Sequence, residues 1–507
     1  MIFLFVFLTC LLTFGDDLYI IVLDKEMTLM TKEELINLIE KVIVSRAEFQ
    51  NIELKAAKKG CPEKIYDSLS SFSNNDDGGI ILFGIDERAG FEKCGVYDLQ
   101  DIQQRITEQC NEMSPKVRPL LSYVEINNGS YIVSAEIPSI DIADRPCFYS
   151  GKGRLKGSYI RVGTSDEHMT EYEIYSYEAY RKKYQDDIRP IPRATSDLMN
   201  LKAIDDYIKS RSENKPQFSL INEEKIHELT SIKINGEYTL ASTLLFGLYP
   251  QAFFPQLCII ATVLPGSEVG ELGENQERFF DNLRIEGTIK DMLTDAIAFV
   301  RKNTKIKTII DPKTGERKDK ADYPITAVRE VILNALVHRD YSIHTEGMPI
   351  QLQIFPDRLV VTNPGGLYGR IRLSQLGEKQ ADTRNPVLAT ALETMKITEN
   401  RYSGIPTIRR EMREAGLPMP QFENKRDSFC VTLFGERKNT YNKAADETTI
   451  LAFCSTPRSR EEIADFLGIN SVTYAINRYV TPLVKQGKLV LSNPASPKSP
   501  KQRFIAK

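Results

Sequence analysis

The pattern of apolar and polar positions predicts alternating helices and strands along most of the chain. The clearest helix covers residues 327–342, where apolar residues recur at helical spacing and polar residues interrupt one side. Glu330 and Asn334 are four residues apart, so their side chains project from the same side of this helix. A carboxylate one turn before an amide suits a site for Mg²⁺ and phosphate. On this stretch alone, an ordinary amphipathic helix explains the pattern equally well.

The region of residues 30–185 mixes helical and strand-like patterns and predicts one α/β domain. An amphipathic helix is expected first, and then strands near residues 48–55, 80–85, 122–126, 131–137 and 158–162. Three carboxylates stand at the ends of the first two strands, namely Glu48, Glu53 and Asp86. Such a trio could hold a divalent metal against a phosphodiester. The alternative is that these acids only cap and pair within the fold.

Basic residues near these acids supply charge for phosphate contacts, with Lys55 and Arg161 as the candidates. Residues 186–320 predict a connecting region of short helices and a strand near 257–264, leading into the next domain. We find no catalytic constellation in this connecting region.

The region of residues 321–436 contains the helix described first and then strands at 348–355 and 357–362. The second strand runs into Asn363-Pro-Gly365-Gly366, and glycines after a strand let backbone N–H groups approach a ligand closely. Gly404 opens a later helix, where unpaired N–H groups and the helix dipole favour an anion. A plain β-turn is the alternative for the glycine pair. The helix at 327–342 ends in a run of hydrogen-bonding residues, of which His338, Arg339 and Asp340 are further candidates to bind a nucleotide.

The last region, residues 446–507, predicts three short helices and two strands, the arrangement of a winged helix-turn-helix. From Gly468 onward it contains seven basic residues and no acidic one, which is a local signature of nucleic-acid binding. The expected contacts to the major groove come from the recognition helix. They are Ser471, Thr473, Tyr474, Asn477 and Arg478. A winged helix that binds protein is the alternative.

Composition limits the possible functions and locations of the protein in three ways. The 507 residues carry a net charge of −3, so any nucleic-acid surface must be local. The eight cysteines and four histidines are scattered, which disfavours a zinc site or disulfide framework and fits a reducing cytosol. Residues 1–29 begin with an apolar stretch that lacks a basic flank and is too short to span a bilayer. We expect an over-extended start, with Met27 or Met30 as the true one, and a membrane anchor is the competing hypothesis.

The first domain resembles the Schlafen-type AlbA-like domain of bacterial proteins described as transcriptional regulators. The matching motifs are EFQNIELK at 48–55, SFSNNDDGGIILFGID at 71–86 and YIRVGTSDEHMT at 159–170. The resemblance implies nucleic-acid association. Schlafen proteins with nuclease activity use three carboxylates for catalysis. Glu48, Glu53 and Asp86 occupy the matching positions.

The third domain resembles a divergent GHKL-type ATP-binding domain, of the class named after the RecG C-terminus. Glu330 and Asn334 match the residues that act there as general base and Mg²⁺ ligand. Asn363, Gly365 and Gly366 match the adenine-binding box, with asparagine in place of aspartate, and Gly404 resembles the second glycine box. The resemblance therefore implies ATP and Mg²⁺ as cofactors. No GxxxxGK[ST] motif is present, so the sequence gives no support to a helicase motor.

Together these patterns predict an α+β multidomain protein: an AlbA-like α/β domain, a GHKL-like α/β sandwich and a C-terminal winged helix. The expected function is ATP-responsive DNA binding in transcription regulation, in the cytoplasm and without a membrane contact. RNA is an alternative partner, and we expect a homo-oligomer. The competing hypothesis is a Schlafen-like metal-dependent nuclease that acts on tRNA or single-stranded nucleic acid, for example in defence.

Overall fold

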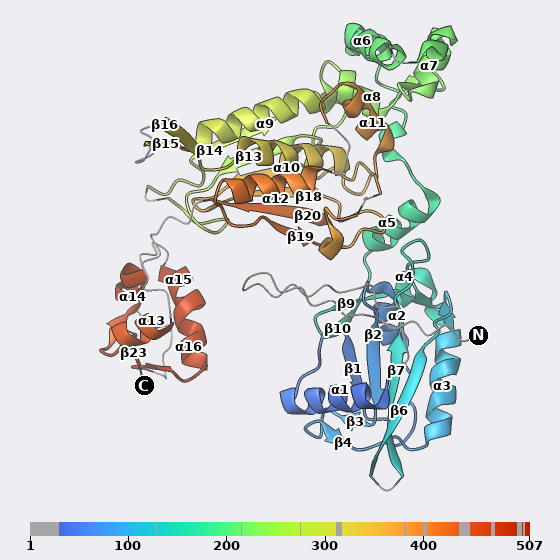
Figure 1. Ribbon diagram of the computed structural model, residues 1–507, viewed down its shortest axis with the longest axis vertical. Helices are drawn as coiled ribbons and strands as arrows, with labels where there is room; N and C mark the ends of the chain where they lie inside the picture. Colours follow the sequence, from blue (N-terminus) through green and yellow to red (C-terminus); the bar gives the residue numbers. More distant parts are fainter. Residues whose placement is uncertain are drawn as a thin grey trace, which may run out of the picture. The chain divides into compact units, whose positions relative to one another are not determined.

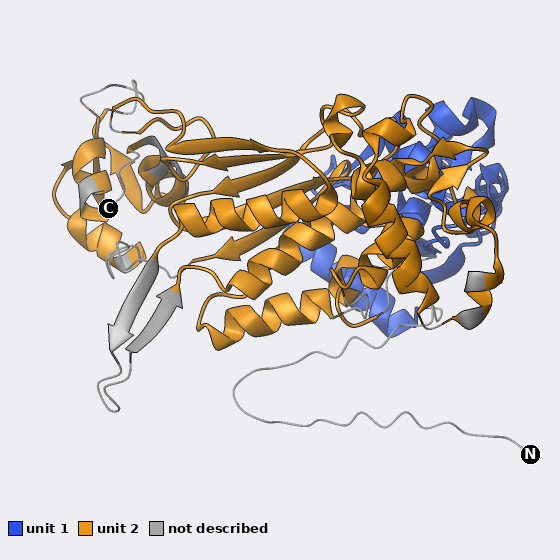
Figure 2. Ribbon diagram, turned by 90° about the horizontal axis from the view of Figure 1, so that it is seen from above, with its two compact units in different colours: residues 1–181 blue, residues 182–507 orange. Residues whose placement is uncertain are grey.

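The computed structural model describes residues 30–506 with short gaps, and residues 1–29, the predicted leader, lie outside the described part. The gaps are residues 128, 214, 274, 311–316, 380–381, 399–402, 436–446, 468–471, 494–498 and 500–501. The chain divides into two compact units, residues 1–181 and residues 182–507 (Figure 2). Each unit is described separately below.

The first unit is built on a four-stranded sheet in the order β1-β2-β7-β6. Strand β1 runs parallel to β2, and the remaining neighbours are antiparallel. The long β6 and β7 form a hairpin (Figure 1). The strands are β1 (Ile52–Lys55), β2 (Gly79–Phe83), β6 (Leu120–Asn127) and β7 (Ser130–Ile137). A separate hairpin, β9 (Tyr159–Val162) and β10 (Ser165–His168), follows later in the chain.

Helices cover both faces of this sheet because alternate strand residues point to opposite sides. Helix α1 (Lys32–Ser45) packs its apolar stripe against one face, where Leu54 and Leu82 are buried. Helices α2 (Tyr66–Asn74) and α3 (Leu99–Asn111) form a second core on the other face with Phe83. The unit ends with helix α5 (Glu171–Lys182).

The second unit is built on a six-stranded sheet in the order β14-β13-β17-β18-β20-β19. All neighbours are antiparallel except β13 and β17, which run parallel. The strands are β13 (Ile259–Val263), β14 (Asp281–Ile285), β17 (Ile350–Ile354), β18 (Arg358–Pro364), β19 (Gln421–Asn424) and β20 (Ser428–Phe434). Strands β13 and β14 come from residues that the sequence placed in a connecting region, so that region supplies part of this sheet.

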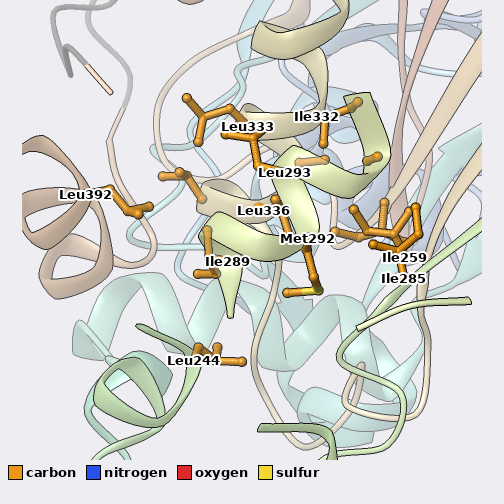
Figure 3. Packing of buried hydrophobic residues seen from close by; sticks show 14 of the residues in the cluster. Leu244, Ile259, Ile285, Ile289, Met292, Leu293, Ile332, Leu333, Leu336 and Leu392 are labelled. Atoms are coloured by element: carbon orange, nitrogen blue, oxygen red, sulfur yellow. The ribbon is translucent and has the colours of Figure 1, made fainter. Parts of the chain in front are cut away.

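Three helices lie side by side across one face of the six-stranded sheet: α9 (Ile289–Asn303), α10 (Ile325–His338) and α12 (Gly404–Glu414) (Figures 1 and 2). Figure 3 shows how α9 and α10 share one core, with Met292 and Leu293 of α9 near Leu336 of α10. Two shorter helices, α8 (Leu240–Phe246) and α11 (Pro386–Thr394), add Leu244 and Leu392 to it. The fold is therefore the mixed α and β architecture that the sequence predicted.

The last described segment forms a small core of its own. Its elements are α13 (Glu447–Phe453), β21 (Arg458–Ser459), α14 (Arg460–Leu467), α15 (Val472–Ala475), α16 (Thr481–Lys485), β22 (Leu489–Leu491) and β23 (Arg503–Ala506). The three strands form an antiparallel sheet in the order β21-β23-β22. Ile463, Leu467 and Leu483 are buried between this sheet and the helices. This order of elements agrees with the predicted winged helix, which stays a prediction.

Candidate functional site

A cavity of about 1110 Å³ opens along helix α10 in the second unit. Four polar residues of α10 line it, each four positions from the next: Thr326, Glu330, Asn334 and His338. Most other side chains of α10 are buried, as expected of a helix in the core. This polar stripe therefore faces the cavity, and α10 is a core helix rather than an amphipathic surface helix.

The N-terminus of helix α12 lies against the middle of this stripe. A Cβ atom added at Gly404 would lie 3.0 Å from Nδ2 of Asn334 and 3.2 Å from Oε2 of Glu330. Ser403 precedes the helix, but its side chain makes no capping hydrogen bond within the described chain. The first backbone N–H groups of α12 thus lie close to a carboxylate and an amide, an arrangement that suits phosphate oxygens together with a cation.

Glu330 is also held by the residue before it. Nη1 of Arg329 lies 2.9 Å from Oε1 of Glu330, and Nη2 of Arg329 donates a hydrogen bond to the carbonyl of Ile397. Oxygen ligands from a carboxylate or an amide are those that Mg²⁺ prefers. The oxygen atoms of Asn334 and Glu330 therefore fit this ion chemically when phosphate supplies further oxygens.

The other end of the cavity is formed where β18 ends. Asn363 is only 6% exposed, and its Oδ1 has no hydrogen-bond partner in the described part of the chain. Because a buried polar atom without a partner is costly, this oxygen is suited to accept a hydrogen bond from a ligand. Asn363 and the following Gly365 and Gly366 all line the cavity.

Gly365 must be glycine for steric reasons. Its φ is +94°, and a Cβ atom there would lie 2.4 Å from Nη1 of Arg384 and 2.5 Å from Cβ of Asp340. Asp340 and Arg384 form an ion pair of 2.9 Å, and both side chains are almost fully buried. Nη2 of Arg384 also donates to the carbonyl of Gly366. This ion pair fixes the turn after β18, which fixes that wall of the cavity.

Arg339 and Asp340, which the sequence placed among the nucleotide ligands, do not line the cavity. The guanidinium of Arg339 is buried and donates hydrogen bonds to the carbonyls of Thr345 and Met348, so it shapes the loop after α10. Asp340 holds Arg384. Both residues support the walls of the cavity from behind.

His338 does line the cavity, and its side chain is accessible from it. Burial among the surrounding protein atoms and the positive charge of Arg384 lower the pKa of His338 to about 4. The imidazole is therefore neutral at physiological pH, with one donor and one acceptor nitrogen.

The sequence did not reveal the cations that line the cavity. They are Arg329, Lys379, Arg384, Lys396 and Arg410. Lys379, Arg384 and Lys396 lie outside the helices and strands, where no periodicity marks a facing side. Arg329 could have been predicted to lie near the cavity, because it directly precedes Glu330 in the sequence.

In the first unit, the residues proposed to contact phosphate are bound to acids. Arg161 has a side chain that is 1% exposed, and its Nη1 lies 2.9 Å from both Glu53 and Asp166. It also donates to the carbonyls of Gln50 and Ile52. The prediction of Arg161 as a phosphate contact was therefore wrong, since the side chain joins β1 to the β9–β10 hairpin. Lys55 is partly exposed and pairs with Glu53 at 2.6 Å.

The three candidate nuclease carboxylates do not come together as a metal site. Among the described residues, no three His, Cys, Asp or Glu side chains form a group that could hold a metal ion. Oδ1 of Asp86 accepts the backbone N–H groups of Arg88 and Ala89 in its own turn. Glu48 accepts the N–H of Leu54, and burial and the charge of Glu53 raise its pKa. In the structure these acids accept backbone N–H groups or pair with basic side chains.

Of the five candidate DNA contacts in the last segment, Arg478 is exposed. Ser471 and the side chains of the other three residues, Thr473, Tyr474 and Asn477, lie outside the described part. Among the described basic residues of this segment, Lys488 pairs with Glu447 and Arg503 pairs with Glu462. Across the part of the chain that the structure describes, no helix has the length and apolarity needed to cross a membrane.

Comparison with protein families identifies two domains. Residues 48–170 match the family described as "Schlafen, AlbA_2", and residues 347–433 match the family described as "Putative ATP-dependent DNA helicase recG C-terminal". The chain therefore contains an AlbA_2 domain of the Schlafen type and an ATPase-like domain of the RecG C-terminal type, so both resemblances seen in the sequence are confirmed. Neither match extends to residues 447–506.

Solved structures that are similar to the chain include the following two. The crystal structure of the DIP2311 protein from Corynebacterium diphtheriae is 17% identical, with 94% of this chain and 97% of that chain covered and a TM-score of 0.38. The solution structure of the N-terminal domain of a RecG-related protein from Nitrosomonas europaea is 23% identical. It covers 26% of this chain and 92% of that domain, with a TM-score of 0.22. The search of curated proteins gave no match.

Proposed function

We propose that the cavity along α10 binds ATP with Mg²⁺, and that nucleotide binding controls how the chain binds DNA as a regulator of transcription. The supporting observation is one geometric fact. The polar stripe of α10 faces an uncapped helix N-terminus at Gly404, and the same cavity reaches the unpartnered Oδ1 of Asn363. The thirteen residues from Thr326 to His338 span roughly 18 Å of helix, about the length of an extended nucleotide triphosphate.

The end at Asn363 is suited to the adenine base. The free Oδ1 can accept a hydrogen bond from the adenine amino group, which an uncharged amide does as well as an aspartate. Neutral His338 can exchange hydrogen bonds with the base or the ribose. Because the wall here is fixed by the pair of Asp340 with Arg384, this end is preorganised for a flat ligand.

The end at Gly404 is suited to the phosphates. The backbone N–H groups at the start of α12 would receive phosphate oxygens, and Asn334 with Glu330 would hold Mg²⁺. Bound Mg²⁺ would supply charge neutralisation for the phosphate chain. Arg329 already pairs with one oxygen of Glu330, the residue that would act as a base in hydrolysis. The proposal therefore concerns nucleotide binding rather than turnover.

Equilibrium binding of a labelled ATP with Mg²⁺ tests the site directly. We expect the Asn334→Ala variant to bind at least about tenfold more weakly, a loss typical of one ligand to a charged group. Asn282→Ala is a matched control, because Asn282 is an exposed asparagine on the edge strand β14 of the same unit. Equal binding by wild type and Asn334→Ala, or none by either, would remove the ATP proposal.

For nucleic acid, the domain family of the first unit and the basic last segment support a DNA partner. Gel shift of a DNA library with and without ATP, on wild type and Arg478→Ala, tests this part. We expect wild type to shift the DNA to an extent that depends on ATP, and Arg478→Ala to shift it less. A shift that is the same with and without ATP would show that the nucleotide does not control DNA binding. Cleavage of tRNA or single-stranded DNA in Mg²⁺ or Mn²⁺, lost in Glu53→Gln, would instead favour the nuclease. The expected homo-oligomer stays a prediction that light scattering measures.

A further inference from the structure

Lys396 lies just after helix α11 and lines the cavity. Among the cationic side chains that line this cavity, Arg329, Arg384 and Arg410 are paired with carboxylates. Within the described ranges of the chain, Lys396 makes no ion pair, and its side chain is exposed. A cation that faces a cavity without a counter-ion in the protein is available for an anionic ligand.

The backbone at Lys396 is unusual for a lysine. Its φ is +57°, the left-handed region that glycine occupies most readily. The hydrogen bonds explain why this conformation occurs. The N–H of Lys396 donates to the carbonyl of Glu393, and the N–H of Ile397 donates to that of Leu392. This is the Schellman ending of a helix, in which the left-handed position is most often glycine.

The same helix ending is attached to the phosphate end of the cavity. The carbonyl of Ile397, the next residue, accepts a hydrogen bond from Arg329, and Arg329 pairs with Glu330. Lys396 is therefore held beside the part of α10 that faces the N-terminus of α12. A lysine thus occupies a position where glycine would fit the backbone better. The segment that carries this lysine lies beside the proposed phosphate site.

We propose that Lys396 binds the phosphate chain of the nucleotide, as a ligand separate from the glycine boxes and from Asn334. This inference rests on the proposed function of the cavity and assigns one more residue to it. Lys396 contributes affinity in proportion to the number of phosphates and has no part in recognising the base. The left-handed backbone is retained because the ammonium group is needed there.

Equilibrium binding of ATP, ADP and adenosine to the full chain in Mg²⁺ tests the proposal. The variants are Lys396→Met, which removes the charge, Lys396→Arg, which keeps it, and Lys396→Gly, which also relieves the backbone. We expect Met and Gly to lower ATP affinity by about 10- to 100-fold and to leave adenosine affinity within about twofold, as for the loss of a charged hydrogen bond. Lys396→Arg should retain most of the ATP affinity.

Stability measurements separate a ligand from a structural role. Lys396→Gly should unfold at the same or a higher denaturant concentration than wild type, while still losing ATP affinity. Lys290→Met is the matched control, since Lys290 is exposed on α9. Unchanged ATP affinity in Lys396→Met, or an equal loss for ATP and adenosine, would overturn this inference and leave the ATP site standing. Absence of ATP binding by wild type would overturn both.

Discussion

Asp187 caps helix α11 from 200 residues away in the sequence. Its Oδ2 accepts the backbone N–H of Val387 at 2.9 Å and that of Leu388 at 3.1 Å, and the side chain is fully buried. Burial raises the pKa of Asp187 from 3.8 to about 6, although the two hydrogen bonds act in the opposite direction. A carboxyl that is hard to ionise thus holds the N-terminus of a helix beside the cavity.

The raised pKa makes the stability of the second unit depend on pH. Because the folded pKa lies above the unfolded value, the stabilisation is fully present below pH 3.8 and is lost as pH rises through about 6. A shift of about two units corresponds to about 3 kcal/mol. Asp187→Asn keeps an acceptor oxygen and carries no charge. Its free energy of unfolding relative to wild type should therefore increase by about 3 kcal/mol between about pH 4 and pH 7.

Urea denaturation followed by far-UV circular dichroism, repeated across this pH range, measures the difference. Subtracting wild type from variant at each pH cancels the titration of all other groups, so only the slope of the difference matters. Asp197→Asn is a suitable control because Asp197 is exposed. Parallel pH profiles for wild type and Asp187→Asn would show that the Asp187 carboxyl titrates normally in the folded protein, and the reasoning from burial would be refuted.

Three further substitutions test the packing described above. Gly404→Ala places a Cβ atom 3.0 Å from Nδ2 of Asn334, so calorimetry should show at least about tenfold weaker ATP binding with an unchanged fold, and equal affinity would contradict the site. Arg161→Met removes a buried guanidinium that pairs with both Glu53 and Asp166, so the first unit should lose about 3–5 kcal/mol in thermal unfolding. A variant that is equally stable but binds nucleic acid poorly would restore the original interpretation. Gly365→Ala sets a Cβ atom 2.4 Å from Arg384, so the denaturation midpoint should fall by the equivalent of about 2 kcal/mol or more, and no change would show that the turn can relax.

The helix that carries the site could be predicted from the sequence because its signal is local. Spacing alone placed Glu330 and Asn334 on one side of a helix, and α10 has this arrangement. Spacing could not show that the polar side faces a cavity rather than solvent, since both give the same pattern. That distinction depends on α12 and β18, whose residues are distant in the sequence.

The residues misplaced by the sequence are charged residues inside the fold. Arg161 alternates with Ile160 along β9, and an arginine next to an isoleucine is usually the exposed one of the two. Here the arginine is inside because Ser68 and Ser71 of α2, which are also buried, bind its partner Asp166. A buried polar network of this kind is stable only when all of its residues are present. No single position in the sequence therefore predicts it.

Arg339 was misplaced for a different reason. The helix ends at His338, and the extended backbone that follows turns the next side chain away from the cavity. A pattern read at helical spacing loses its meaning one residue beyond the end of the helix. Lys396 was missed for the converse reason, because a residue after a helix has no period to reveal which side it faces.

Helix α11 joins two places that the chain keeps far apart. Its first N–H groups are bound by Asp187, and residues 183–188 connect the last helix of the first unit to the second. Lys396, just after its C-terminus, lines the cavity. Binding equilibria at the two ends of one rigid element are reciprocal: if a phosphate at Lys396 shifts α11, the free energy of the Asp187 contact changes by the same amount that Asp187 changes phosphate affinity. The pKa of the Asp187 carboxyl would then change when nucleotide binds, and nucleotide affinity would change when that carboxyl is protonated. Both changes have the same coupling free energy, so measuring either one gives its value.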